Sequence, residues 1–302
     1  MKLGIIGLPQ AGKTTIFNAL TRGNRPTLTA GGRFEVNTAV VDVPDPRVDR
    51  LSALFRPRKT IYAKVTYADI TGLEGSSSAI SGPLLTELSQ MDGFLHVARA
   101  FESDVVPHSA GSVEPARDLT SLEGELLLND MLVVERKLER LAEEQKKGAG
   151  RDKGVIAREV TLFERMQAAL AEEIPLRALD FSDEDLKALS GFALLTLKPV
   201  LVVVNLSDGQ PDLVLDWPHA AVVSLQGKLE MEIAQLSEEE AAMFLEEYGI
   251  AEPSLSRMIR LSYDLLGLLS FFTVGEDEVR AWTVRRGATA PEAAGVIHSD
   301  LQ

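Results

Sequence analysis

The stretch KLGIIGLPQAGKTT, residues 2–15, decides the fold of this 302-residue chain. Residues 2–6 form a short apolar run typical of a buried strand, and residues 13–21 begin a helical pattern. Between them lies a glycine, four residues and then Gly-Lys-Thr, which is the phosphate-loop pattern. The backbone N–H groups of such a loop surround a β-phosphate, because its glycines permit close approach. The alternative, a glycine-rich turn with an incidental lysine, leaves the strand–loop–helix context unexplained.

The loop predicts the residues that bind the phosphates and a metal ion. Lys13 is expected to bridge the β- and γ-phosphates, and the Thr14 hydroxyl to ligate Mg²⁺. The predicted nucleotide-binding residues of the loop are Gln10, Ala11, Gly12, Lys13, Thr14 and Thr15.

A second motif, Asp69-Ile70-Thr71-Gly72, stands at the end of the β-rich segment IYAKVTYADI at 61–70. A phosphate-loop enzyme needs a carboxylate here for the Mg²⁺ shell and a glycine N–H for the γ-phosphate. Asp69 is therefore predicted at the metal, and Gly72 is predicted to contact the γ-phosphate.

Two further loops stand where nucleotide-binding proteins read the base. PVLVVVN (199–205) and AAVVSL (220–225) read as buried strands, and each is followed by polar residues. Asn205, Leu206 and Asp208 occupy the place of the Asn-Lys-x-Asp motif of guanine-nucleotide proteins, and Gln226 and Gly227 that of a further base-contacting loop. Asn and Asp also commonly follow strands as turn formers, so the order of the motifs carries this prediction.

The pattern of elements predicts an α/β fold of the P-loop NTPase, G-domain-like type, with a mostly parallel sheet. Residues 1–116 and 195–270 are predicted as one discontinuous nucleotide domain, interrupted by a helical hairpin over 117–194. The hairpin carries an apolar seam with coiled-coil spacing. Its members are Leu127, Met131, Val134, Leu138 and Leu141. FFTVGEDEVRAWTV (271–284) predicts two short strands that begin a third piece, residues 271–302.

Composition excludes several classes of protein. The net charge of −14 argues against non-specific binding to nucleic acid or anionic lipid, and no apolar run reaches membrane-spanning length. The absence of cysteine excludes disulfides and thiolate chemistry, and with the missing signal peptide it indicates a cytoplasmic location. Two basic clusters, Arg56–Lys59 and Arg280–Arg286, are expected as solvated surface or as contacts to a partner.

Several long segments resemble the YchF-type branch of the Obg-related translation-factor NTPases. The most specific are ARDLTSLEGELLLNDMLVVERKLERL and EVRAWTVRRGATAPEAAGVIHSD. The resemblance implies a nucleotide domain, an inserted helical hairpin and a C-terminal TGS domain of β-grasp type, here incomplete. It also implies association with the ribosome, and use of ATP as much as or more than GTP. Leu206 replaces the lysine that covers a guanine ring, although Asp208 keeps a carboxylate that would favour GTP if it faced the base.

The chain also departs from the family pattern. Gln10 replaces the family's loop asparagine, and Arg33 stands at a threonine of the first switch. The hydroxyl that ligates Mg²⁺ would therefore be missing unless Thr38 substitutes for it. The second switch is shortened. Leu73 occupies the position where many relatives carry a water-orienting glutamine. The resemblance places a substitute histidine at His108, for which the alternative is an ordinary exposed loop residue.

These observations predict a Mg²⁺-dependent purine nucleotide triphosphatase of slow turnover, associated with the ribosome. The alternative is a nucleotide-gated binding module with little hydrolysis, which Arg33, Leu73 and the short second switch favour. A small-molecule kinase is disfavoured because no segment resembles an acceptor site or lid.

Overall fold

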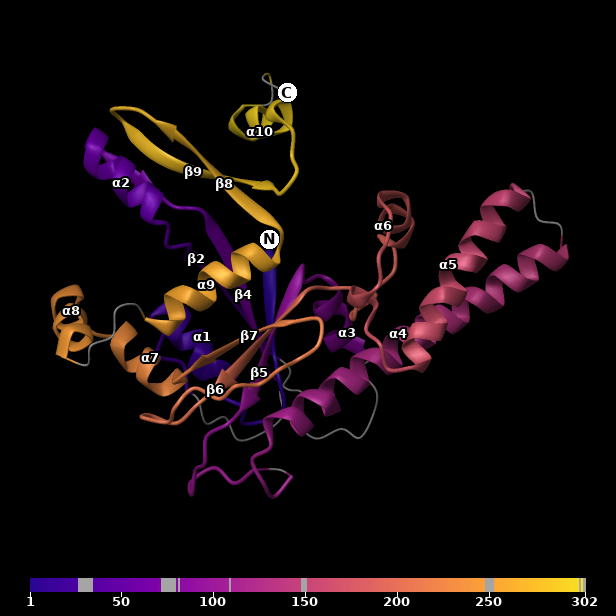
Figure 1. The fold of residues 1–302 in the computed structure, drawn as a ribbon, viewed down its shortest axis with the longest axis horizontal. Helices are drawn as coiled ribbons and strands as arrows, with labels where there is room; N and C mark the ends of the chain where they lie inside the picture. The colour runs from indigo at the N-terminus through magenta and orange to yellow at the C-terminus, as the bar shows by residue number, and fades with distance from the viewer. Residues whose placement is uncertain are drawn as a thin grey trace.

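A mostly parallel sheet forms the centre of the computed structural model, which describes residues 1–26, 35–71, 80, 82–108, 110–147, 151–247, 253–298 and 300. The strand order is β2-β4-β1-β5-β6-β7, and only β2 is antiparallel to its neighbour. The strands are β1 (Lys2–Ile6), β2 (Glu35–Asp42), β4 (Lys64–Thr71), β5 (Gly93–Arg99), β6 (Val200–Asn205) and β7 (Ala221–Leu225). The predicted α/β class is thereby confirmed (Figure 1).

Helices cover both faces of this sheet. Helices α1 (Lys13–Thr21) and α9 (Ser254–Leu265) pack on one face, and α7 (Gly227–Ala234) lies against α1 and leads to α8 (Glu238–Glu247). Helix α3 (Gly82–Ser89) and the first turns of α4 cover the other face. After β1 the chain adds β2 and β4 on one side of that strand, and then β5, β6 and β7 on its other side. This is the topological switch point at which α/β proteins bind ligands.

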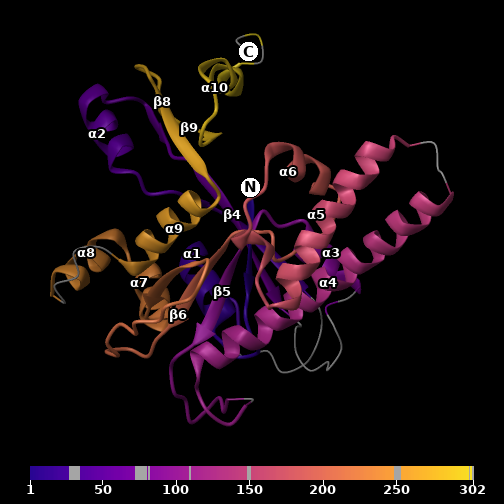
Figure 2. The ribbon, with the colours of Figure 1, turned by 45° about the vertical axis from the view of Figure 1, so that its right-hand side comes forward.

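Two long helices project from the sheet as an antiparallel hairpin (Figures 1 and 2). Helix α4 spans Pro115–Lys147 and α5 spans Lys153–Ala171. Leu127 and Val134 of the predicted seam are buried against Phe163 and Met166 of α5. The 3₁₀ turn η1 (Leu176–Ala178) and helix α6 (Asp183–Leu189), which begins with a capping box at Ser182, return the chain to β6.

A second, three-stranded sheet holds the C-terminal segment in the order β3-β9-β8. Strands β8 (Leu268–Val274) and β9 (Glu278–Arg285) are the predicted pair, flanked by α2 (Pro46–Phe55) and α10 (Ala290–Ile297). The third strand, β3 (Lys59–Ile61), overlaps the predicted β-rich segment 61–70 only at Ile61. The chain turns between β3 and β4, where the carbonyl of Ala63 accepts from the N–H of Val43 at 2.8 Å.

The predicted boundary between residues 270 and 271 consequently falls inside β8, and β3 joins the C-terminal sheet from far upstream. The predicted boundary at 116/117 falls inside α4. The division of the chain into three parts stays a prediction.

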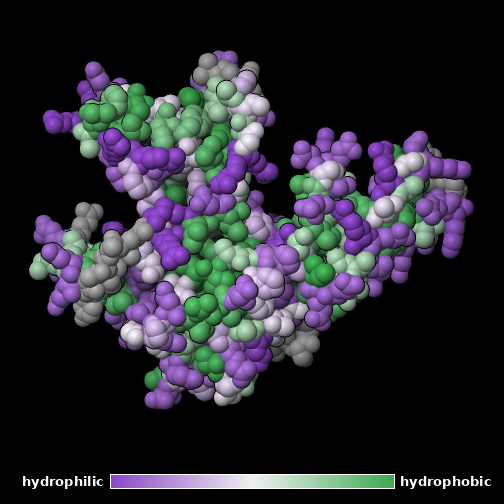
Figure 3. All heavy atoms as spheres, in the orientation of Figure 1, coloured by the Kyte–Doolittle hydropathy of each residue, from purple (hydrophilic) through white to green (hydrophobic). Residues whose placement is uncertain are grey.

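The surface differs between the lobes. Hydrophilic side chains cover the far end of the hairpin, whereas hydrophobic side chains gather around the C-terminal sheet and α2 (Figure 3). Among the described residues, no helix is both long and apolar enough to cross a membrane.

Candidate nucleotide site

The phosphate loop connects the end of β1 to the start of α1. Gly12 has φ +93°, a conformation that side-chain-bearing residues rarely adopt, and a Cβ there would collide with the amide of Asn205. Gln10 also has a positive φ of 62° and is exposed. Nζ of Lys13 donates to the carbonyls of Gly7 (3.0 Å) and Leu8 (2.9 Å), so the ammonium group lies within the loop. The ammonium group of Lys13 therefore lies inside the loop that is predicted to bind phosphate oxygens.

Thr14 and Asp69 meet at the mouth of this loop. The Thr14 hydroxyl donates to Oδ2 of Asp69 at 2.9 Å, and Asp69 is only 1% exposed. Burial raises the pKa of Asp69, and the Thr14 hydrogen bond and the Lys13 charge oppose that shift. Oδ1 of Asp69 is buried and has no hydrogen-bond partner within the described part of the chain. A hydroxyl oxygen beside a carboxylate with a vacant lone pair is a donor set that suits Mg²⁺.

Thr38 does not complete this site. It pairs with Ala68 across β2 and β4, whereas Asp69 pairs with Asn37. Paired residues project from the same face of a sheet and successive residues alternate, so the Thr38 side chain lies on the face opposite Asp69. Of the two alternatives, a missing hydroxyl or its replacement by Thr38, this register favours the missing hydroxyl. Arg33, Gly72 and Leu73 lie outside the described residues.

Asn205 joins the phosphate loop to the second base-reading loop. Its Nδ2 donates to the carbonyl of Ala11 at 3.0 Å, and its Oδ1 accepts from the N–H of Gly227 at 3.0 Å. The side chain is buried at the carboxyl end of β6. Both ends of the amide are thus used to hold two predicted nucleotide-binding segments together.

The remaining residues predicted to read the base differ in where their side chains lie. Leu206 is 3% exposed and packs in the core beneath the sheet, so it contributes no surface to cover a base. The carboxylate of Asp208 is exposed and lies 3.6 Å from Nζ of Lys228. Gln226 accepts from the N–H of Gly209 at 3.1 Å and donates to the carbonyl of Gln210 at 3.3 Å, which links the two predicted loops.

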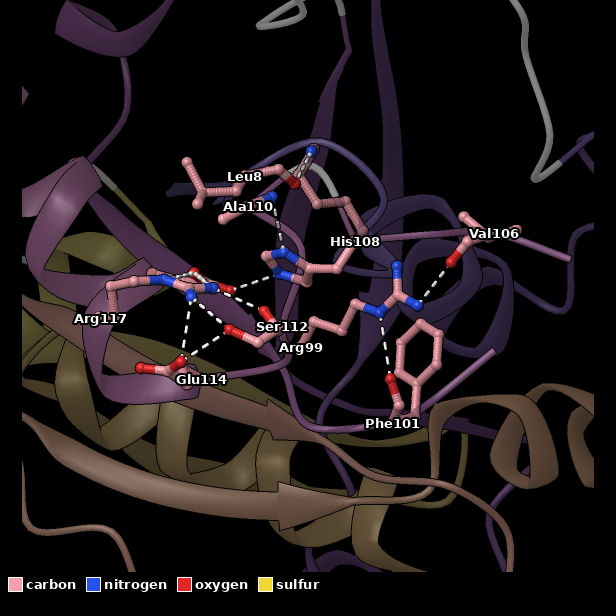
Figure 4. Close-up of polar contacts among 11 residues, drawn as sticks. Leu8, Arg99, Phe101, Val106, His108, Ala110, Ser112, Glu114 and Arg117 are labelled. Atoms are coloured by element: carbon pink, nitrogen blue, oxygen red, sulfur yellow. Dashed lines mark hydrogen bonds and ion pairs between the residues drawn. The ribbon is translucent and has the colours of Figure 1, made fainter. Parts of the chain in front are cut away.

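His108 lies in the segment between β5 and α4 (Figure 4). Its Nε2 is 2.7 Å from Oδ2 of Asp118, and its Nδ1 accepts from the N–H of Ala110 at 3.1 Å. Its side chain is 5% exposed, so the alternative of an ordinary exposed loop histidine does not describe it. His96 is fully buried in β5, as its strand position predicts.

Comparisons with known proteins agree with this geometry. The chain is 38% identical to the ribosome-binding ATPase YchF of Bacillus subtilis and 40% identical to that of Escherichia coli O157:H7, over 99% and 100% of this chain and 85% of each relative. The chain belongs to the YchF family. A family model, YchF-GTPase_C, described as a protein of unknown function, matches residues 268–302.

Other relatives of this YchF-family chain extend to eukaryotes. Obg-like ATPase 1 of Rattus norvegicus is 33% identical over all of this chain and 80% of the relative. The solved structure of the Schizosaccharomyces pombe YchF GTPase is 32% identical, covers 99% of this chain and 84% of its own, and superposes with a TM-score of 0.83. The predicted family and fold are thereby confirmed.

Two residues of this YchF-family chain that contact the His108 segment were not predicted from the sequence. Arg99, at the end of β5, is 2% exposed and donates to the carbonyls of Phe101 (3.0 Å) and Val106 (2.6 Å). Asp118, in the first turns of α4, holds His108. Arg99 could have been predicted, because it is an arginine at the carboxyl end of a buried strand. No local sequence pattern indicates Asp118.

Proposed function

We propose that this protein binds and slowly hydrolyses a purine nucleoside triphosphate with Mg²⁺, ATP being favoured over GTP, and that its nucleotide state governs association with the ribosome. The observation that carries the proposal is the phosphate loop at the switch point, with Lys13 inside the loop and Thr14 bonded to Asp69 at 2.9 Å. This arrangement brings a cation, a hydroxyl and a carboxylate together where a polyphosphate binds.

The preference for ATP rests on the base-reading loops and on the relatives. Reading guanine requires a carboxylate that accepts two base N–H groups, with a lysine stem over the ring. Asp208 faces Lys228 instead, and the side chain at the lysine position, Leu206, is buried. The bacterial relatives carry the name ribosome-binding ATPase. The Asn205 amide and the Gln226 loop then shape the pocket without selecting guanine.

Thr14 and Asp69 would hold the metal ion. Bound Mg²⁺ supplies charge neutralisation for the β- and γ-phosphates. Lys13 gives up its bonds to the loop carbonyls and donates to phosphate oxygens, while the backbone N–H groups of Ala11, Gly12 and Thr15 donate to the β-phosphate. Gly72 donates its N–H to the γ-phosphate, and His108 orients the attacking water.

The lobes outside the nucleotide domain are the proposed docking surfaces for the ribosome. The hairpin of α4 and α5 projects from the sheet. The C-terminal sheet carries Arg280 on β9, and the exposed Arg58 lies directly before β3. Reversing charge at Arg56, Arg58 and Lys59 should lower co-sedimentation with ribosomes and make the remaining binding less dependent on salt, because fewer basic side chains neutralise phosphates. Unchanged co-sedimentation would contradict this part of the proposal.

Titration of fluorescent ATP and GTP, with and without Mg²⁺, tests the proposal directly. Lys13→Ala should weaken both nucleotides by at least about tenfold, because a charge-assisted bond to phosphate is lost. Lys64→Ala is the matched control, since Lys64 is exposed on β4 and forms an ion pair with the exposed Asp42. Full affinity of the Lys13 variant for both nucleotides would overturn the proposal.

Single-turnover hydrolysis separates the enzyme from a nucleotide-gated binding module. The enzyme should hydrolyse ATP in one cycle, and His108→Ala should slow that step by about 100-fold without changing nucleotide affinity. Binding of ATP without measurable hydrolysis by the wild-type protein would favour the binding module instead.

A further inference from the structure

Both ring nitrogens of His108 are already engaged. Nδ1 accepts the N–H of Ala110, so this nitrogen carries no proton and the ring is neutral with its proton on Nε2. Nε2 then donates that proton to Oδ2 of Asp118 at 2.7 Å. A neutral imidazole has one donor and one acceptor, and here each has a partner.

It follows that His108 cannot orient a water in this arrangement. To hold a water, the ring needs a nitrogen that is free and exposed, yet the side chains of His108 and Asp118 are each only 5% exposed. The ring must first leave Asp118.

Asp118 itself is fixed. Its Oδ1 accepts from Nε (3.0 Å) and Nη2 (2.7 Å) of Arg117, and the same guanidinium donates to the hydroxyl and carbonyl of Ser112. Asp118 also lies on the long helix α4. A carboxylate with one oxygen held by an arginine and the other presented to an imidazole is a rigid acceptor.

Hydrogen bonds hold the chain on both sides of His108. Arg99 is buried in β5 and donates hydrogen bonds to the carbonyls of Phe101 and Val106. Its guanidinium group also stacks on the Phe101 ring, with Cζ 4.6 Å from the ring centroid. Gly111, at φ +81°, closes a turn onto the carbonyl of His108 at 3.0 Å. The chain is thus held before His108 by Arg99 and after it by the contacts of Arg117 with Ser112.

We propose that Asp118 is a positioning residue that holds His108 in reserve, and that breaking the His108–Asp118 hydrogen bond is the step that makes His108 available for hydrolysis. The inference rests on the proposed function of His108. Arg117 keeps the acceptor in place, and Arg99 holds the chain before His108. The consequence is a low basal turnover that rises when a partner or the nucleotide draws His108 away from Asp118.

Chemical modification tests the contact without relying on catalysis. Diethyl pyrocarbonate acylates accessible, unprotonated imidazoles, and mass spectrometry measures each histidine separately. His298, whose side chain is 64% exposed, is the reactive internal standard, and buried His96 is the protected one. Wild-type His108 should react much more slowly than His298, and Asp118→Ala should raise its rate at least about fivefold with His298 unchanged.

Glu114→Gln is the matched control for this experiment, because Glu114 pairs with Arg117 at 3.3 Å but does not contact His108. It should leave His108 protected. A circular dichroism melt identifies any variant that fails to fold, and Asp118→Leu, which offers His108 no acceptor oxygen either, then replaces Asp118→Ala. Wild-type reactivity of His108 equal to that of His298, or unchanged protection in the Asp118 variant, would overturn the proposal.

Kinetics test the consequence. Asp118→Ala should raise kcat for ATP by about tenfold with KM within about twofold, since a charge-assisted hydrogen bond no longer holds the ring back. The double variant with His108→Ala should return to the rate of His108→Ala alone. A lower or unchanged kcat in Asp118→Ala, while His108→Ala is impaired, would contradict the inference. Wild-type hydrolysis by His108→Ala would instead overturn the proposed function and leave the modification result standing.

Discussion

Gly227 donates its backbone N–H to the side-chain oxygen of Asn205 at 3.0 Å, and the nitrogen of that same amide donates to the carbonyl of Ala11. One buried side chain therefore ties the loop after β7 to the phosphate loop after β1. A Cβ at Gly227 would lie 2.6 Å from the amide oxygen, so the contact requires a residue without a side chain.

Gly227→Ala should break this link. The added methyl group forces the Asn205 amide to shift, which costs about 2 kcal/mol of unfolding free energy and weakens nucleotide binding because the phosphate loop loses its support. Urea unfolding and nucleotide titration measure the two effects. Gly191→Ala is the control, since a Cβ there meets no atom within 4 Å. Equal stability of the two variants would contradict the prediction.

Asp69→Asn should stabilise the protein while impairing its metal dependence. Burial raises the pKa of Asp69, so the ionised carboxylate is unfavourable in the folded state, and a neutral amide of the same shape removes that cost. We expect a gain of about 1 kcal/mol in unfolding free energy and loss of the Mg²⁺ effect on ATP affinity. Asp42→Asn, exposed on β2, should change neither quantity. A Mg²⁺ effect that persists in Asp69→Asn would remove Asp69 from the metal site.

Asp130→Ala should loosen the base of the hairpin. Its buried carboxylate accepts from the N–H of Leu195 (2.8 Å) and from the N–H (2.7 Å) and hydroxyl (2.6 Å) of Thr196. Removing it leaves these donors without an acceptor in the interior, at a cost of about 3 kcal/mol. Thermal melts compare this variant with Asp212→Ala, which changes an exposed loop residue. The prediction fails if both melt at the same temperature.

His96 should make the protein sensitive to acid. Burial lowers the pKa of His96 to about 3, whereas an exposed histidine titrates near 6.5. The unfolded chain therefore binds a proton that the folded chain excludes, and stability falls as the pH drops from about 6.5 towards 3. Between pH 7.5 and pH 5 this one group costs about 2 kcal/mol.

His96→Leu removes that titration. Its unfolding free energy should fall by about 2 kcal/mol less than that of the wild type between pH 7.5 and pH 5, as measured by urea unfolding at each pH. His298→Leu, at an exposed position, should retain the wild-type pH dependence. Parallel pH profiles for His96→Leu and the wild type would show that another group carries the proton.

The central sheet and the phosphate loop were predictable because their signals are local. An apolar run of strand length, a glycine-rich turn and the start of a helix lie within residues 2–21, and the seam through Leu127 and Val134 repeats along a single helix. Periodicity and turn chemistry act over a few residues, so a sequence records them directly.

The features that escaped prediction depend on contacts between distant segments. β3 has only three residues, and it becomes a strand because Thr60 pairs with Val279. The double use of the Asn205 amide depends on how β6 lies beside β1's loop, which no spacing rule encodes. Strand register places Thr38 on the face of the sheet opposite Asp69, because successive residues along β2 project from opposite faces.

The pairing of β3 with β9 also determines when the C-terminal sheet can form during synthesis of the chain. Residues 59–61 leave the ribosomal exit tunnel early, yet their pairing partner in β9 emerges more than 200 residues later. Until then Lys59–Ile61 has no partner strand. Val48 of α2 is likewise not yet covered by Val279 and Ala281, which belong to the same core cluster. The lobe around α2 therefore reaches its final form only after β9 has been synthesised, and an early segment of the chain depends on a much later one.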